Sequence, residues 1–444
     1  MDYTSKNKTE QNDMLKTIGI NCIKDLFVNI PRNLVLNKLN ICHGNTEQEI
    51  LTHLHNVAKK NKILISFRGA GIYDHYIPAL VKEIVNRSEF RTSYTPYQAE
   101  ASQGTLQAIF EYQSLICALT DLDVSNASLY DGATAVVEAI LMSIRYKKTK
   151  KILISEALNP EYIKVIITYF KHLEVDLIFL ETTNGIIDNN TLLNKLDDNT
   201  TAVVIQSPNY FGLIENMKSL CYWTKKFNSL FIAVVNPLSL GVFCTPGEYN
   251  ADIAVGENQG LGSPMSFGGT TCGFIVTKKS LAWRLPGRIV GQTKDIKGER
   301  GFVLTMQSRE QHIRRVNATS NICTNASLNA LASCVFLSGW GSKGFKKLAE
   351  VNIAKAKYTF KQIKSLNGFS SKFGDQTFFN EFVIKTTKDI NKINKILLYN
   401  NILGPLNLSN ANANAKLKNC MLFCVTEQRT KSEIDSLIEI LKTI

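Results

Sequence analysis

The sequence predicts an α/β protein with a large, mostly parallel β-sheet and a smaller α/β unit at the carboxyl end. Two patterns lead to this prediction. Short β-branched runs alternate with helical stretches through the middle third of the chain. A second, shorter set of strand and helix patterns follows a glycine-containing segment near residue 338. Apolar residues make up 44% of the 444 residues, so the chain can bury a large core.

The predicted sheet rests on short apolar runs that have the length and composition of buried strands. Helical patterns separate most of them, as at Pro160–His172 and Ile214–Asn228. Parallel strands need crossover connections that are usually helices, so a parallel sheet covered by helices on both faces is expected. The predicted strands are Lys151–Ser155, Val175–Leu180, Thr201–Gln206, Leu230–Val235 and Ala251–Val255, with Cys272–Thr277 as a candidate for one more.

The chain is expected to divide into three segments. Residues 1–65 are helical in pattern and end in a short strand-like run. The sequence SGWGSKG marks a boundary at Ser338, and the predicted strands Glu381–Lys385 and Cys420–Thr426 lie beyond it. A capping box at Thr430 and Glu433 starts the last helix. We therefore expect a helical segment over residues 1–65, the large sheet domain over 66–337 and the small domain over 338–444.

Composition narrows the class of protein. The net charge of +13 comes from 51 basic and 38 acidic residues, and the lysines are spread along the chain. This pattern indicates a solvated surface or attraction to an acidic partner. No nucleic-acid recognition motif accompanies the charge, so nucleic-acid binding is not expected. No apolar run approaches the ~20 residues that span a bilayer, and the N-terminus has no apolar signal core. A cytoplasmic protein without membrane association is expected, and the spacing of cysteine and histidine predicts no metal site.

Two glycine-containing segments of the predicted sheet domain are candidates for binding a small molecule. Tyr130–Ile140 places Gly132 at a helix start, where backbone N–H groups attract anions such as phosphate. An ordinary helix start capped by Asp131 fits the same residues. Ala251–Gly269 follows a strand, and ligands bind at the carboxyl ends of strands in such sheets, although a structural turn is the alternative.

A third candidate segment, Arg309–Asn325, places cationic side chains directly before hydroxyl and amide side chains. Donors of these kinds suit an anion or a cofactor, whereas a charge run alone usually means a solvated helix face. The residues concerned are Arg309, His312, Arg314, Arg315, Thr319, Ser320, Asn321 and Thr324.

The fourth candidate segment, Ser93–Glu100, joins Tyr94, Tyr97 and Gln98 around Pro96. The proline rules out a regular helix through this segment and favours a rigid loop. Such a loop either lines a site with its aromatic side chains or forms a surface turn with packed aromatics.

Together these segments resemble the glycine cleavage P-protein family. In some members of the family the protein is split into two chains, and this chain is similar to the amino-terminal half-subunit. The resemblance covers most of residues 17–335 and fits the last hundred residues loosely. It is carried by TIGINCIKDLFVNIP, FRGAGIYDHYIPA, SYTPYQAEASQG, YDGATA, VNPLSLG, PGEYNADIAVGENQGLGSPMSFGG, LPGRIVGQTKDIKGERGFVLTMQSREQHIRR and ATSNICTN.

The resemblance implies an aminotransferase-type (fold type I) pyridoxal-phosphate transferase fold. It also implies the reaction, in which glycine is decarboxylated and its aminomethyl group passes to the lipoyl disulfide of H-protein. Pyridoxal phosphate would act as the electron sink. A second P-protein subunit is the implied partner, with an α2β2 assembly expected.

Two residues that this chemistry needs are missing from the expected positions. The Schiff-base lysine of the family's catalytic half lies five residues before a proline, and counting back from Pro264 reaches Gln259. The aspartate beside the pyridine nitrogen belongs just after Leu230–Val235, where Asn236 stands; a neutral amide cannot hold a pyridinium as a carboxylate does. The chain is therefore expected to have no catalytic residue of its own, and the partner subunit to bind the cofactor covalently.

The resemblance assigns the polar segments to the partner's site. Tyr94, Tyr97 and Gln98 are expected to line that site or the channel to it. Thr319, Ser320, Asn321 and Thr324 are expected near the cofactor or its phosphate. Because the lipoyl carrier of the family is typically acidic, Arg309, Arg314 and Arg315 are candidates to attract it or to hold the adjoining loop, and their closeness to that loop favours the structural role.

Three other readings compete with this assignment. A non-catalytic scaffold or regulatory subunit derived from a pyridoxal-phosphate enzyme would share the missing lysine, but it would not need the tyrosine and hydroxyl segments together. A self-sufficient transaminase would need a lysine near residue 259, and none occurs between Lys226 and Lys278. A basic nucleic-acid binder would reveal itself through salt-sensitive binding to nonspecific DNA.

Overall fold

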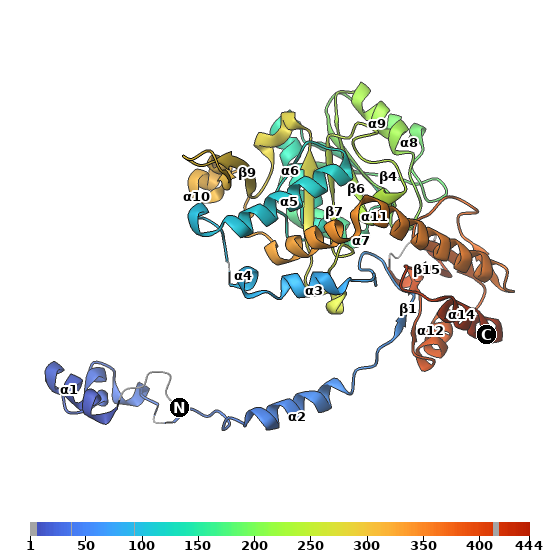
Figure 1. Ribbon diagram of the computed structural model, residues 1–444. Helices are drawn as coiled ribbons and strands as arrows, with labels where there is room; N and C mark the ends of the chain where they lie inside the picture. The colour runs from blue at the N-terminus through green and yellow to red at the C-terminus, as the bar shows by residue number, and fades with distance from the viewer. Residues whose placement is uncertain (1–6, 37, 93, 412–416) are drawn as a thin grey trace. The chain divides into compact units, whose positions relative to one another are not determined.

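The structure is a computed structural model that describes residues 7–36, 38–92, 94–411 and 417–444 (Figure 1). It divides into two units, Met1–Lys62 and Ile63–Ile444. The first unit contains α1 (Lys8–Ile18) and α2 (Glu47–Ala58), each started by a capping box. None of its described residues is buried, so within residues 7–36 and 38–62 local interactions hold the helices.

The second unit is built on a seven-stranded sheet in the order β2-β8-β7-β6-β5-β3-β4. The five central and outer strands β3 to β7 run parallel to one another, and β8 runs antiparallel to both neighbours. The large, mostly parallel sheet predicted from the sequence is confirmed. The strands are β2 (Val124–Ser125), β3 (Lys151–Ser155), β4 (Asp176–Leu180), β5 (Thr200–Gln206), β6 (Leu230–Val235), β7 (Ile253–Glu257) and β8 (Gly273–Thr277).

Helices cover both faces of this sheet because alternate residues of each strand point to opposite sides. Leu153, Val203 and Phe231 belong to one core, which includes buried residues of α5 (Gln103–Thr120), α9 (Met217–Lys226) and α11 (Ser327–Lys364). Their neighbours Ile152, Ala202 and Ile232 belong to the other core, with residues of α6 (Gly132–Lys147) and α7 (Pro160–Phe170). Both faces are apolar, which explains why these strands read as continuous hydrophobic runs.

A smaller antiparallel sheet in the order β11-β12-β15-β14 follows, and its core includes residues of α12 (Ile390–Tyr399) and α14 (Lys431–Thr443). Thr430 caps α14 as its sequence predicts. Helix α11 runs through the boundary expected at Ser338 and leaves helical geometry at Gly341; the division into three segments stays a prediction. The strands are β11 (Phe369–Ser371), β12 (Glu381–Thr386), β14 (Leu406–Asn407) and β15 (Cys420–Cys424).

One hairpin has no counterpart in the sequence prediction. Strands β9 (Ile289–Lys294) and β10 (Arg300–Thr305) pair antiparallel around a turn that contains Asp295 and Gly298. The outer half of β9 is exposed, so it lacks the apolar alternation of a half-buried strand. The Asp-x-x-Gly turn was the signal available in the sequence.

The remaining elements are short. Strand β1 (Ile65–Ser66) pairs in parallel with β13 (Ile402–Leu403). The other helices are α3 (Ala79–Val85), α4 (Ser88–Arg91), α8 (Asn189–Leu193), α10 (Gln311–Arg314) and α13 (Leu408–Ala411). No helix in the described part of the chain is long and apolar enough to cross a membrane.

Candidate functional site

At the carboxyl edge of the large sheet, the position after β6 and β7 where the cofactor is expected is nearly closed. Asn236 follows β6 and Gln259 follows β7, and both line a cavity of only about 40 Å³. Such a volume holds about one or two water molecules, whereas cofactor sites usually measure roughly 300–1,000 Å³. The structure therefore brings Asn236 and Gln259 to one place and leaves little room between them.

Gln259 acts as a clip between two loops. Its buried side-chain oxygen accepts from Tyr73 N at 2.9 Å, and its Nε2 donates to Tyr73 O at 3.0 Å and to Ser263 O at 2.9 Å. An amide suits this position because it donates and accepts at once, which a lysine cannot do. Asn236 is also used locally, since its Oδ1 accepts from Leu238 N at 3.1 Å.

The N-terminus of α6 is occupied by a carboxylate of the same chain. Glu257, the last residue of β7, accepts from the backbone N–H groups of Gly132 at 2.9 Å, Cys272 at 2.8 Å and Gln259 at 3.0 Å. Burial raises the pKa of the Glu257 carboxyl, and these hydrogen bonds oppose the rise. Asp131 caps the same helix through Thr134 N at 2.7 Å, as its sequence predicts.

The ring of Tyr162 closes the space over this helix end. A Cβ atom at Gly132 would lie 2.1 Å from the Tyr162 hydroxyl, so any larger residue there would have to displace this ring. A phosphate at this helix N-terminus would have to displace both Glu257 and Tyr162. With Gln259 and Asn236 also committed to local hydrogen bonds, the residues at this position do not fit pyridoxal phosphate.

A second buried carboxyl ties the 67–78 loop to the small sheet. Glu381, at the start of β12, accepts from Ala70 N at 2.6 Å and from the Tyr73 hydroxyl at 2.8 Å. Burial raises the pKa of Glu381 to about 7. A Cβ at Gly69 would lie 2.5 Å from the same carboxylate, so the glycine lets the loop approach it. Because Glu381 is more than 300 positions from this loop in the chain, no local pattern in the sequence indicates the contact.

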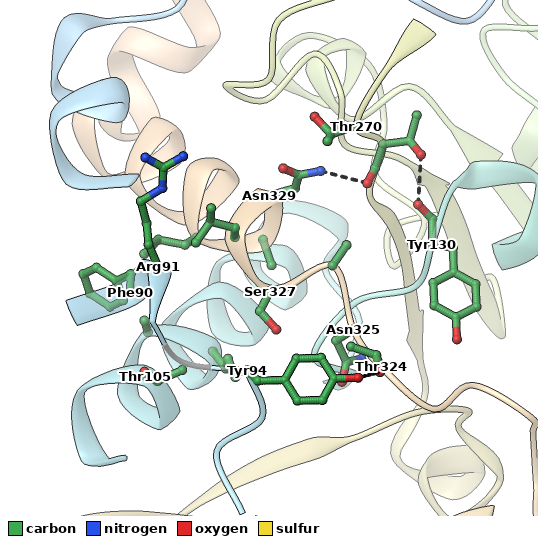
Figure 2. Close-up of a pocket in the computed structure, with 17 residues that line it drawn as sticks. Phe90, Arg91, Tyr94, Thr105, Tyr130, Thr270, Thr324, Asn325, Ser327 and Asn329 are labelled. Carbon is green, nitrogen blue, oxygen red and sulfur yellow. Dashed lines mark hydrogen bonds between the residues drawn. The ribbon is translucent and has the colours of Figure 1, made fainter. Parts of the chain in front are cut away.

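A larger pocket lies elsewhere, on the side of α5 and the start of α11. It encloses about 570 Å³ and is lined by Tyr94, Tyr130 and Thr324 among others. Figure 2 shows Tyr94 beside Thr324, with Phe90 and Arg91 of α4 on another side of the pocket. The two hydroxyls of Tyr94 and Thr324 are 3.2 Å apart. The structure thus brings together one residue from each of the two polar segments singled out in the sequence.

Tyr97 reaches the second polar segment through an arginine. Arg288, which is 6% exposed, donates to the Tyr97 hydroxyl at 2.8 Å and to Asn325 Oδ1 at 3.3 Å. Glu310 lies on the other side of the guanidinium, 3.7 Å from its Nε. The sequence prediction missed both Arg288 and Glu310, because Arg288 is an isolated arginine in LPGR and its partner Tyr97 is 191 positions away in the chain.

The other predicted site residues are placed differently. Thr319 lies 3.5 Å from Leu285 O and 3.4 Å from Arg309 O through its hydroxyl, and the buried Ser320 accepts from Ile322 N at 3.1 Å. Gln98 and Asn321 are exposed. Gln98, Thr319, Ser320 and Asn321 are absent from the lining of the pocket, so their assignment to a site stays a prediction.

The arginines of the charge run separate into two kinds. Arg309 is buried and donates to the carbonyls of Met306, Leu285 and Gly287. Arg314 and Arg315 are exposed. In addition, the described residues contain no group of three or more His, Cys, Asp or Glu side chains that could hold a metal ion.

Comparisons with known proteins agree on one family. A sequence model described as "Glycine cleavage system P-protein" matches residues 1–441. A protein of Endomicrobium trichonymphae named "Probable glycine dehydrogenase (decarboxylating) subunit 1" is 62% identical over 442 residues, with 99% of each chain covered. A crystal structure of glycine decarboxylase (P-protein) of the glycine cleavage system, in inhibitor-bound form, superimposes with a TM-score of 0.91 at 37% identity and covers 100% of both chains.

A more distant structure supports the fold alone. A C-DES variant with glycine covalently linked to its PLP cofactor matches with a TM-score of 0.63 at 13% identity, covering 90% of this chain and 99% of that one. The aminotransferase-type, fold type I architecture predicted from the sequence is thereby confirmed. From the full-length family match and the 62% identity, this chain belongs to the glycine cleavage system P-protein family.

Proposed function

We propose that this chain is subunit 1 of a two-chain glycine decarboxylase and that its partner, a lysine-bearing second subunit, holds the pyridoxal phosphate. In the reaction the bond between the carboxyl carbon and the α-carbon of glycine breaks and carbon dioxide leaves. The aminomethyl carbon becomes bonded to one sulfur of the lipoyl disulfide of H-protein. The other sulfur takes up a proton, so the disulfide is the two-electron acceptor.

The observation that carries the proposal is the filled position at the N-terminus of α6. Helix N-termini bind phosphate because their free N–H groups and the helix dipole favour an anion. Here the carboxylate of Glu257 already accepts from Gly132 N and two other backbone donors. A chain that keeps the fold but fills its own cofactor position needs a second chain for the chemistry.

The open pocket supports a contributing role for this chain. Its lining combines Tyr94, Thr324 and Arg91 with a volume of about 570 Å³, which is within the usual range for ligand sites. We assign this pocket, with Tyr97 beside it, to the wall of the partner's site or of the channel that admits the lipoyl arm. This assignment separates the proposal from a purely scaffolding role, in which the tyrosine hydroxyls would be dispensable.

The proposal is tested by mixing the purified chain with its second subunit, pyridoxal phosphate, glycine and lipoylated H-protein. Carbon dioxide release from carboxyl-labelled glycine is expected only when both chains are present. Sedimentation should show a heterodimer or an α2β2 complex with a large interface, of the order of several thousand Å² as in obligate assemblies. Full activity of the second chain alone, or two chains that sediment independently, would refute the proposal.

A pair of variants distinguishes the scaffold alternative. Tyr94→Phe removes only the hydroxyl that lies 3.2 Å from Thr324, and Asn321→Ala removes an exposed amide. Complexes that assemble normally but decarboxylate glycine more slowly support a role in the partner's site. If both variants keep full activity, the result supports a scaffold role and refutes the assignment of this pocket to the partner's site.

A further inference from the structure

A single buried guanidinium joins the two polar segments beside the open pocket. Arg288 donates through one terminal nitrogen to the Tyr97 hydroxyl at 2.8 Å and through the other to Asn325 Oδ1 at 3.3 Å. Asn325 is in turn held by its Nδ2, which donates to Ser128 O at 2.7 Å. The arginine backbone is also fixed, since Ala127 N donates to Arg288 O at 2.8 Å. The backbone of Arg288 and its contact with Asn325 therefore fix the position from which its guanidinium donates to Tyr97.

A counter-charge keeps this arginine in place. Glu310 is as buried as Arg288, and its Oε2 lies 3.7 Å from Arg288 Nε. Buried charges persist only when they are paired. Glu310 faces the inner edge of the guanidinium, so the two terminal nitrogens remain free to bond Tyr97 and Asn325.

The contact with Arg288 sets the direction of the Tyr97 hydroxyl. A phenol has one proton and an oxygen that accepts. The oxygen accepts from Arg288, so its own proton points elsewhere. The guanidinium also lies over the ring, 5.1 Å from its centre, and the His312 ring packs edge-on at 6.1 Å. Tyr97 is 54% exposed. The arginine and histidine contacts hold its ring, and its hydroxyl can donate a hydrogen bond toward the outside of the protein.

We infer that Arg288 is a positioning residue that holds Tyr97 as an outward hydrogen-bond donor to a carboxylate, the carboxylate of glycine, at the composite site. This inference rests on the proposed function. A carboxylate is the class favoured by the geometry because a hydroxyl donor forms its strongest bonds with ionised oxygens. Arg288 itself would touch no substrate and would act through Tyr97.

The test is a double-mutant cycle on the assembled two-chain enzyme. Tyr97→Phe removes the donor, and Arg288→Lys keeps the charge but loses the planar fork. Each single variant is expected to raise the KM for glycine about tenfold and to change kcat less, since a hydrogen bond to a charged group is worth about that much. The KM of the double variant should not exceed the higher of the two single-variant KM values, because both substitutions remove the same interaction.

Arg309→Lys provides the matched control. Arg309 is a buried arginine of the same region, but it bonds only to backbone carbonyls. Its variant is expected to lower the melting temperature, and its effect on the KM for glycine should multiply with that of Tyr97→Phe. Measuring melting temperatures of all variants separates loss of folding from loss of substrate binding.

Three outcomes would overturn the inference while the wild-type pair remains active. They are an unchanged KM for glycine in Tyr97→Phe, multiplicative effects of Tyr97→Phe and Arg288→Lys, and a defect confined to the KM for H-protein. Because Tyr97→Phe deletes only a half-exposed hydroxyl, it should fold and decide the question even if Arg288→Lys does not. A wild-type pair without glycine decarboxylation would instead refute the proposed function.

Discussion

The carboxylate of Glu257 accepts a hydrogen bond from the backbone N–H of Gly132 at 2.9 Å, which places a negative charge at the first turn of α6. The two residues are 125 positions apart in the chain. Their contact joins the end of β7 to the start of the helix that would otherwise attract a phosphate. Together with Gln259 beside it, this contact fills the position where a self-sufficient enzyme of the same fold would need room for its cofactor.

The isolated chain should form no covalent adduct with pyridoxal phosphate at a defined lysine. Gln259 cannot condense with an aldehyde, and the anion position at α6 is filled by Glu257. After incubation with the cofactor and reduction with borohydride, peptide mapping should reveal only scattered labelling of exposed lysines. A single lysine labelled in one-to-one ratio would contradict this prediction.

Replacing Glu257 with glutamine should destabilise the chain. All three hydrogen bonds to its carboxylate come from backbone N–H donors, so an amide NH2 in place of one oxygen would face a donor. Leaving a buried donor unpaired costs about 1–3 kcal/mol, which should lower the urea midpoint with an unchanged slope. Glu161→Gln on the exposed surface of α7 is the control, and equal losses in both variants would refute the specific role of Glu257.

The buried carboxyl of Glu381 should make stability depend on pH between about 4.5 and 7. Burial raises its pKa to about 7 in the folded chain, whereas the unfolded chain ionises near 4.5. Unfolding therefore releases a proton in this window, and stability falls as the pH rises, by roughly 3 kcal/mol in all. Glu381→Gln should flatten this dependence, because the Tyr73 hydroxyl can reverse its hydrogen bond and accept from the amide.

Glu215 provides the contrast for that experiment. Burial also raises the pKa of Glu215 to about 7. Its two oxygens accept from Asn209 Nδ2 at 2.8 Å and from Ile187 N at 2.9 Å. Unlike the Tyr73 hydroxyl, the Asn209 amide cannot reverse its role, because its Oδ1 already accepts from Phe211 N and Leu213 N. Glu215→Gln should thus lower stability at every pH. Denaturant melts from pH 4.5 to 8 measure both variants, and similar behaviour of the two would exclude the proposed difference.

The exposed and buried arginines should differ in their response to salt. Charge reversal of Arg314 and Arg315 should lower kcat/KM for H-protein, since complementary charge mainly speeds encounter. The loss should shrink as salt screens charges beyond ~8–10 Å. Arg309→Met should instead lower the melting temperature at all salt concentrations, because its buried guanidinium bonds three backbone carbonyls. A salt-independent defect in the Arg314 and Arg315 variant would argue against steering.

The sequence by itself determined the parallel strands of the large sheet and the absence of a suitable lysine. Strands β3 to β7 are apolar on both faces, so their runs stand out from the helices between them. Caps such as Asp131 and Thr430 act within four residues of the helix that they start. Signals of this kind are local, and they survive without knowledge of the fold.

The tertiary structure alone decided what fills the cofactor position and what supports the polar segments. The bond of Glu257 to Gly132 depends on β7 lying next to β8 and beside α6, which no local pattern specifies. The bond of Arg288 to Tyr97 joins residues 191 positions apart. A hydrogen bond of about 3 Å forms only when packing fixes both partners. These two contacts therefore depend on how the strands and helices are arranged in space and not on the residues next to them in the chain.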